Sequence, residues 1–220
     1  MNILVIDPGT STGYCIAKLE TDEEGYYTSA DIFEYGFIDV DNSSEYQGDH
    51  CIDLMERLQN MIDEHWIEHI AVEDYFFSRK CRNGSNVNAA FRTAIHILAR
   101  QNSIDYTILN ISAWKTFVGK RSTPTKEQKA KWGGEAAKKL HIQQALWDRF
   151  KFRFPNHSLS EKTGKPIVFR YDIVDVVAQA VYYCGLVCAV PLKNISLSVE
   201  IPKDVEFKRP SKKVFVYPKK

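Results

Sequence analysis

The segment YDIVDVVAQAVYYCGLVCAV (residues 171–190) is the feature that most constrains how this chain can fold. A helix over Tyr171–Ala189 is apolar on nearly every side, so it must be buried against other elements. Asp172 and Asp175 lie three residues apart and share one face of its first turns. Buried carboxylates are costly and two adjacent ones repel, so the pair predicts a positive group between them. The alternative is that Asp172 caps the helix and Asp175 adds favourable charge to its first turn.

The elements before this helix follow a regular order of three strands and then alternating helices and strands. Apolar runs predict the strands, and apolar residues three and four apart predict the helices. The expected strands are Ile3–Asp7, Tyr14–Leu19, Ile32–Val40, His69–Glu73 and Tyr106–Ile111, and the expected helices are Gly48–Trp66, Val87–Arg100, short helices within 112–150, and Tyr171–Ala189. Residues 152–170 resemble a loop. This order is typical of an α/β fold that resembles ribonuclease H, with a five-stranded mixed sheet flanked by helices.

Acidic residues end two of the expected strands. Asp7 closes the first strand, and Glu73 and Asp74 close the fourth. Together with Asp172 and Asp175 they would form a cluster of hard oxygen ligands, which suits Mg²⁺ or Mn²⁺. Two such ions close together can drive in-line phosphoryl displacement, because one activates water and the other stabilises the leaving oxygen. The strand pattern alone does not choose between Glu73 and Asp74.

The turn DPGTSTGY (residues 7–14) allows a different interpretation. It also resembles the first phosphate loop of the actin–hexokinase superfamily, in which backbone N–H groups of a glycine-rich turn bind a phosphate. The alternative function is therefore an ATPase or sugar kinase. Such proteins need two domains of this kind, for which 220 residues leave no room, and they rarely need two acids on the last buried helix. A third possibility is a DNA-binding module without activity, against which the full set of acids argues.

The net charge of +1 hides a strong asymmetry along the chain. Residues 19–74 contain 17 acidic residues and one basic residue, whereas residues 115–151 contain ten basic and three acidic residues. This distribution indicates one face suited to an anion, although solvated helix faces explain such a stretch equally well.

Three segments together resemble the RuvC-type Holliday junction resolvases. These are IDPGTSTGY, VEDYFF and YDIVDVVAQAVYYC, in that order. The resemblance covers roughly residues 1–190, the expected nuclease domain, and leaves residues 191–220 as a basic, proline-containing tail. It implies that the catalytic and metal-binding acids are Asp7, Glu73, Asp172 and Asp175, with Glu73 favoured over Asp74 and two Mg²⁺ or Mn²⁺ ions per site.

The resemblance also implies contacts with DNA. ISAWKTFVGK matches the family segment that places a lysine near the phosphates, here Lys115. A second lysine corresponds to Lys138 or Lys139, because an insertion prevents a unique alignment. Phe76 matches an aromatic residue that the family uses near the junction centre. An ordinary core residue at the edge of a strand would also explain Phe76. The expected DNA contacts from the basic insertion are Lys120 and Arg121. Trp114, Trp132 and Trp147 either stack on bases or, more often, anchor helices.

The implied substrate is a four-way DNA junction cut by hydrolysis of phosphodiester bonds. Because a junction has two-fold symmetry, two active sites and hence a homodimer are expected, with the helix at 87–101 as a candidate interface. No signal peptide or membrane span is visible, and the five cysteines suit a reducing compartment, so we expect a cytoplasmic protein. The divergence from the bacterial pattern suggests a viral or phage member, acting in the host cytoplasm.

Overall fold

The fold is taken from a computed structural model that describes residues 1–9, 11–40, 44–74, 82–119, 124–155, 157–159, 166–168 and 172–199. Within these ranges, a six-stranded sheet has the strand order β5-β4-β1-β2-β3-β8. The strands are β1 (Asn2–Asp7), β2 (Ser11–Thr21), β3 (Tyr27–Asp39), β4 (Ile67–Glu73), β5 (Asp105–Leu109) and β8 (Ile195–Leu197). The helices are α1 (Gln47–His65), α2 (Arg82–Gln101), α3 (Ile111–Gly119), α4 (Lys126–Trp132), α5 (Gly134–Phe150) and α6 (Asp172–Tyr182).

The sheet is mixed, as the element order predicts. β1, β2 and β3 form an antiparallel meander, whereas β4 pairs parallel to β1, β5 parallel to β4, and β8 parallel to β3. Each parallel pair of β1, β4 and β5 is joined through a helical crossover, since α1 precedes β4 and α2 precedes β5. The carboxyl ends of β1, β4 and β5 therefore meet at one edge of the sheet.

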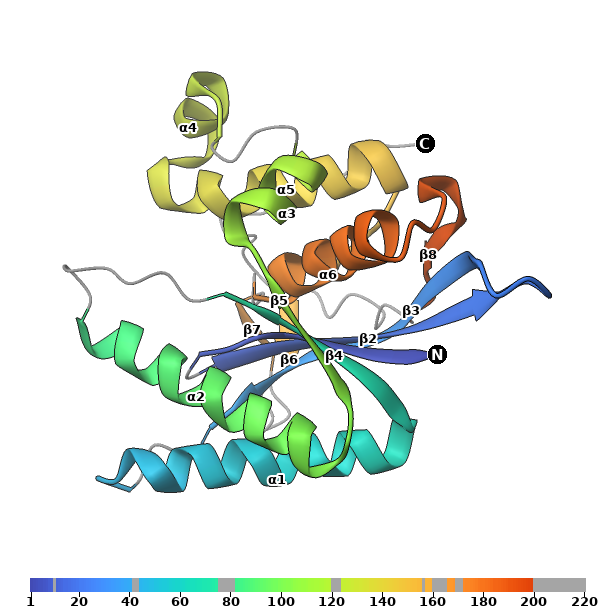
Figure 1. The fold of residues 1–220 in the computed structure, drawn as a ribbon. Helices are drawn as coiled ribbons and strands as arrows, with labels where there is room; N and C mark the ends of the chain where they lie inside the picture. Colours follow the sequence, from blue (N-terminus) through green and yellow to red (C-terminus); the bar gives the residue numbers. More distant parts are fainter. Residues whose placement is uncertain are drawn as a thin grey trace.

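Helices cover both faces of this sheet. Figure 1 shows α3, α5 and α6 on one side and α1 and α2 on the other. Because side chains alternate along a strand, each strand feeds two hydrophobic cores. In β1, Ile3 and Val5 belong to the core beneath α6, whereas Leu4 and Ile6 belong to the core against α1 and α2. The direction of any side chain on β1 or β4 can therefore be assigned to one helical layer.

The structure corrects several expected boundaries. β2 and β3 extend beyond the expected strands, and Ile111 begins α3 instead of ending β5. The expected loop at 152–170 contains a short antiparallel pair, β6 (His157–Leu159) and β7 (Pro166–Val168). The last helix ends its α-helical part at Tyr182 and continues as a π-helix over Tyr183–Val187. The sheet has six strands instead of five, because residues after 190 supply β8, a three-residue strand too short to give a periodic signal.

Among the residues that the structure describes, no helix is long and apolar enough to cross a membrane. The expected cytoplasmic location, and the division of the chain at residue 190, stay predictions.

His69 of β4 contacts both the neighbouring strand β5 and the π-helix that follows α6. Its Nε2 lies 2.9 Å from Thr107 Oγ1 on β5, and its ring lies 5.1 Å from that of Tyr183. Burial lowers the pKa of His69 below its usual value, although Asp105 opposes the shift. A lowered pKa in the folded state means that the unfolded state binds the proton more readily. The folded protein therefore has its full stability above the pKa that His69 has in the unfolded chain, and it loses stability as the pH falls below that value.

We expect the melting temperature to fall as the pH is lowered from about 7.5 to about 5.5, across the ordinary histidine pKa of about 6.5. His69→Gln keeps a hydrogen-bonding group beside Thr107 but does not titrate, so its melting temperature should fall less. His96→Gln, at an exposed position of α2, is the matched control and should behave as the wild type. Equal falls in wild type and His69→Gln would contradict this account.

Candidate active site

The parallel pairing of β1 and β4 brings two of the expected acids together. The register pairs Val5 with Ala71 and Ile6 with Val72. One step further along the same register, Asp7 stands beside Glu73. Neighbouring strands lie about 4.8 Å apart, so the two carboxylates leave the sheet from adjacent backbone positions at its carboxyl edge.

Alternation along the strands then assigns each acid to a face. Asp7 follows Ile3 and Val5, and Glu73 follows Ala71, all of which line the core beneath α6. Asp74 falls on the opposite face, where its carboxylate forms an ion pair with Arg92 of α2. The preference for Glu73 over Asp74, which the strand pattern alone leaves open, therefore has a structural reason. Asp7 and Glu73 share a face, and Asp74 points away from it.

Asp175 lies in the helical layer that covers this same face. It belongs to α6, which packs on β1 and β2, and only 4% of its surface is exposed. Its neighbours Val174 and Val176 are fully buried. A carboxylate buried to this extent is costly unless hydrogen bonds or a positive group compensate it. The position of Asp175 is thus consistent with a cation site on the face where Asp7 and Glu73 project.

Charged residues of two neighbouring helices affect the pKa of His141. It is a buried residue of α5, and its Nδ1 lies 2.9 Å from the carbonyl oxygen of Ala137. Burial lowers the pKa of His141, while Asp175 raises it and Lys115 lowers it. The imidazole therefore lies within electrostatic reach of both a buried acid of α6 and a lysine of α3. Both Lys115 and Asp175 thus lie near His141, although they are 60 positions apart in the sequence.

Trp114 of α3 contacts the site directly. Its indole Nε1–H donates a hydrogen bond of 2.8 Å to Glu73 Oε1, and its side chain is fully buried. Base stacking is therefore excluded for Trp114, which anchors α3 instead. Trp147 is half-buried on α5, and the side chain of Trp132 lies outside the described part of the chain.

The DPGTSTGY turn is closed by its own hydrogen bonds. The Thr12 hydroxyl donates to the Gly9 carbonyl oxygen at 2.7 Å and accepts from the Gly9 N–H at 3.3 Å. Thr12 is fully buried. The N–H of Gly9, one of the backbone donors that a phosphate loop would use, is thus occupied inside the turn, which weakens the interpretation of this segment as a phosphate loop.

Several expected site residues fall outside what the structure describes. Phe76, Lys120 and Arg121 lie outside the described ranges, and the side chains of Asp172 and Lys139 are likewise not described. Lys138 is exposed on α5. Among the described side chains, no three His, Cys, Asp or Glu groups lie close enough together to ligate one ion. What the described part supplies is a donor set of carboxylates alone, which matches the preference of Mg²⁺ and Mn²⁺ for hard oxygen ligands.

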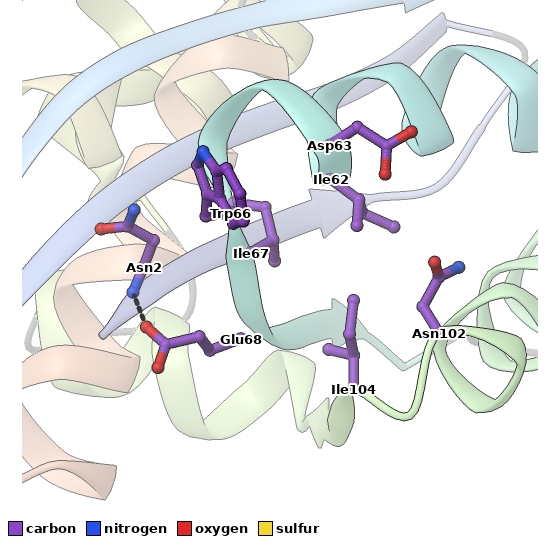
Figure 2. A pocket seen from close by; sticks show the side chains of 8 residues that line it. All are labelled: Asn2, Ile62, Asp63, Trp66, Ile67, Glu68, Asn102 and Ile104. Atoms are coloured by element: carbon purple, nitrogen blue, oxygen red, sulfur yellow. Dashed lines mark hydrogen bonds between the residues drawn. The ribbon is translucent and has the colours of Figure 1, made fainter.

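A pocket of about 610 Å³ lies at the opposite end of the strands. Figure 2 shows it between the end of α1, with Ile62 and Trp66, and the starts of β1 and β4, where the Asn2 N–H donates to Glu68 at 2.9 Å. Because β1 and β4 run parallel, their first residues lie at the edge opposite Asp7 and Glu73. This pocket is therefore separate from the acidic site.

Sequence reasoning missed the contributions of His141 and Arg92, and it did not connect Trp114 with Glu73. A tryptophan directly before the expected DNA-contacting lysine was the available signal for Trp114. No local pattern in the sequence marks His141, because its position near Asp175 and Lys115 depends on the packing of α5 against α3 and α6.

Comparisons with known proteins identify the family of this chain. The family described as crossover junction endodeoxyribonuclease RuvC matches residues 3–133. The RuvC of Helicobacter acinonychis (strain Sheeba) is 31% identical over 134 residues, which cover 59% of this chain and 78% of that protein. The RuvC of Sulfurovum sp. (strain NBC37-1) is 32% identical over 134 residues, covering 59% of this chain and 77% of that protein.

Solved structures show the same fold. A structure of Thermus thermophilus RuvC superposes with a TM-score of 0.55 at 15% identity, covering 86% of this chain and 98% of the other. The same RuvC in complex with a Holliday junction substrate gives a TM-score of 0.55 at 13% identity, covering 86% and 97%. The fold is thus ribonuclease H-like, as the element order predicts. The family match spans Asp7 and Glu73 and extends to Gly133, so the chain belongs to the RuvC family of crossover junction endodeoxyribonucleases.

Proposed function

We propose that this protein is a metal-dependent, structure-specific endonuclease that resolves four-way DNA junctions by hydrolysing phosphodiester bonds. The observation that carries the proposal is the placement of Asp7 and Glu73 on adjacent parallel strands, on the face covered by the helix that buries Asp175. Membership of the RuvC family supports hydrolysis of DNA junctions over phosphate transfer from a nucleotide.

Four acids hold the metal ions in this proposal: Asp7, Glu73, Asp172 and Asp175. Two ions of Mg²⁺ or Mn²⁺ fit a set that contains carboxylate oxygens alone. Bound there, they supply the Lewis acidity that activates a water molecule and stabilises the leaving oxygen. The buried position of Asp175 excludes bulk water from one side of the set, which strengthens its electrostatic interactions.

The basic residues bind and orient the DNA in this proposal. Lys115 packs against the ring of Trp114, which contacts Glu73, and this supports a role of its ammonium group in binding a phosphate near the acids. Lys138, exposed on α5, extends this surface. The remaining contacts are proposed from the family resemblance: Phe76, Lys120, Arg121 and Lys139. Contacts of this kind are made to phosphates and weaken as salt rises.

Asp7→Asn and Asp175→Asn should each lower junction cleavage by more than about 100-fold, since loss of even an indirect metal partner costs 10–100-fold. Junction binding should persist, because the basic residues are unchanged. The assay uses labelled four-way junction, linear duplex and RNA–DNA hybrid with Mg²⁺, alongside a binding assay without divalent ions. Paired nicks restricted to the junction are expected from the wild type. ATP hydrolysis without nuclease activity, or normal cutting by either variant, would overturn the proposal.

Glu73 and Asp74 provide an internal comparison on adjacent positions. Glu73→Gln should abolish cleavage, because its carboxylate lies on the face of Asp7. Asp74→Asn should retain most of the activity and lose stability instead, since it removes the ion pair with Arg92. Cleavage rates at saturating Mg²⁺ and melting temperatures of both variants separate the two roles. Equal loss of cleavage in both variants would show that the assignment by strand face is wrong.

We further propose that the protein acts as a homodimer, because symmetric cutting of a two-fold junction needs two active sites. Large apolar side chains support an interface formed by α2 and the edge strand β5. Ile97 of α2 is 47% exposed, and Ile108, on the α2 face of β5, is 49% exposed.

Ile97→Asp should convert the dimer to a monomer in sedimentation experiments and uncouple the two nicks. Ile52→Asp is the matched control, because Ile52 is an exposed isoleucine of α1, at 56% exposure, outside the proposed interface. Its sedimentation should match that of the wild type. A monomeric wild type that still makes paired nicks would contradict the dimer.

A further inference from the structure

The hydrogen bond between Trp114 and Glu73 joins two elements that are distant in sequence. Trp114 lies in the first half of α3, and Glu73 is the last residue of β4. The indole Nε1 and the carboxylate Oε1 are 2.8 Å apart. Trp114 is completely enclosed, so this contact is shielded from water on the indole side.

The chemistry of the two groups makes this contact directional. An indole has one N–H donor and no acceptor, and a buried indole N–H requires a partner. Glu73 supplies a carboxylate, so the bond is of the stronger, charge-assisted type. With one lone pair of Oε1 engaged by the indole, Oε2 keeps both of its lone pairs for an ion. The contact therefore restricts the rotation of a side chain that otherwise has three rotatable bonds.

The same tryptophan supports the neighbouring lysine. Lys115 Nζ lies 4.9 Å from the centroid of the Trp114 ring, within the range of a cation–π contact. The N–H edge of the ring therefore contacts Glu73, while the face of the ring contacts the ammonium group of Lys115. Phenylalanine keeps an aromatic face and lacks the N–H, so Trp114→Phe separates the two contacts.

We propose that Trp114 is a positioning residue that orients Glu73 so that one carboxylate oxygen faces the metal site. This inference rests on the proposed function, because it takes Glu73 as a ligand. Glu73→Gln, which leaves the tryptophan in place, and Trp114→Phe, which leaves the acid in place, test the contact from its two sides.

The first measurement needs neither metal nor cleavage. In the full-length protein labelled with nitrogen-15, the Trp114 indole N–H resonance is identified by its absence from Trp114→Phe. A carboxylate acceptor shifts this resonance downfield, so Glu73→Gln should move it upfield. Asp74→Asn is the matched control and should leave it in place, because Asp74 pairs with Arg92 on the other face. An unchanged indole resonance in Glu73→Gln would overturn the proposal.

The second measurement separates positioning from packing. Trp114→Phe should raise the Mg²⁺ concentration for half-maximal cleavage by about 10-fold, the usual effect of losing a group that orients a ligand. Its junction affinity should stay near that of the wild type, since Lys115 keeps an aromatic face beneath it. Trp147→Phe, a half-buried tryptophan of α5 in the same helical layer, controls for loss of packing and should leave the Mg²⁺ dependence unchanged.

The outcomes distinguish the two proposals. An unchanged Mg²⁺ dependence in a folded Trp114→Phe protein would overturn the positioning role while leaving the nuclease function intact. A wild-type protein that cuts no junction would overturn the nuclease function, and the indole resonance would still decide whether Trp114 orients Glu73. If Trp114→Phe fails to fold, the Trp114 indole is assigned by elimination with Trp66→Phe, Trp132→Phe and Trp147→Phe, and Glu73→Gln then supplies the resonance test.

Discussion

The parallel pairing of β1 with β4 is the constraint on which the rest of the site depends. It aligns the two strands so that both end in an acid at the same height, Asp7 on one and Glu73 on the other. Antiparallel neighbours could not achieve this, because one carboxyl end would then meet the other strand's amino end. The helical crossover through α1 is what permits the parallel arrangement. The acidic site is therefore a consequence of topology before any side-chain interaction is considered.

Because helices cover both faces of the sheet, the face on which each acid projects decides which residues it contacts. Each step along β4 changes the helical layer that a side chain meets. Glu73 meets Trp114 and the layer of α6, whereas Asp74, one residue later, meets Arg92 of α2. A shift of one residue in register would exchange these environments. Asp175 is buried in this same layer, where a hydrogen bond or a positive charge offsets the cost of burying a carboxylate.

Much of the fold was predictable from the sequence because its signals are local. The apolar runs that end in Asp7 and Glu73 mark β1 and β4, and the apolar helix marks α6. The face on which Glu73 and Asp74 each project depends on the register with β1, which involves residues far apart in the chain. The link from Trp114 to Glu73 spans 41 positions and has no periodic signature. β8 was missed for a related reason, since three residues among prolines and lysines gain strand structure only by pairing with β3.

The short strand β8 also affects how much of the edge of the sheet is open to pairing with another chain. A long exposed edge of a sheet offers its backbone groups to other chains and invites aggregation. Here β3, the longest of the described strands at 13 residues, is bordered over Ala30–Ile32 by β8. Asp31 anchors this border, because its carboxylate accepts hydrogen bonds from Ser196 at 2.5 Å and Ser198 at 2.6 Å. β8 thus covers three of the 13 residues of β3 and shortens the stretch of this edge that could pair with another chain, with the charged Asp31 at the covered position.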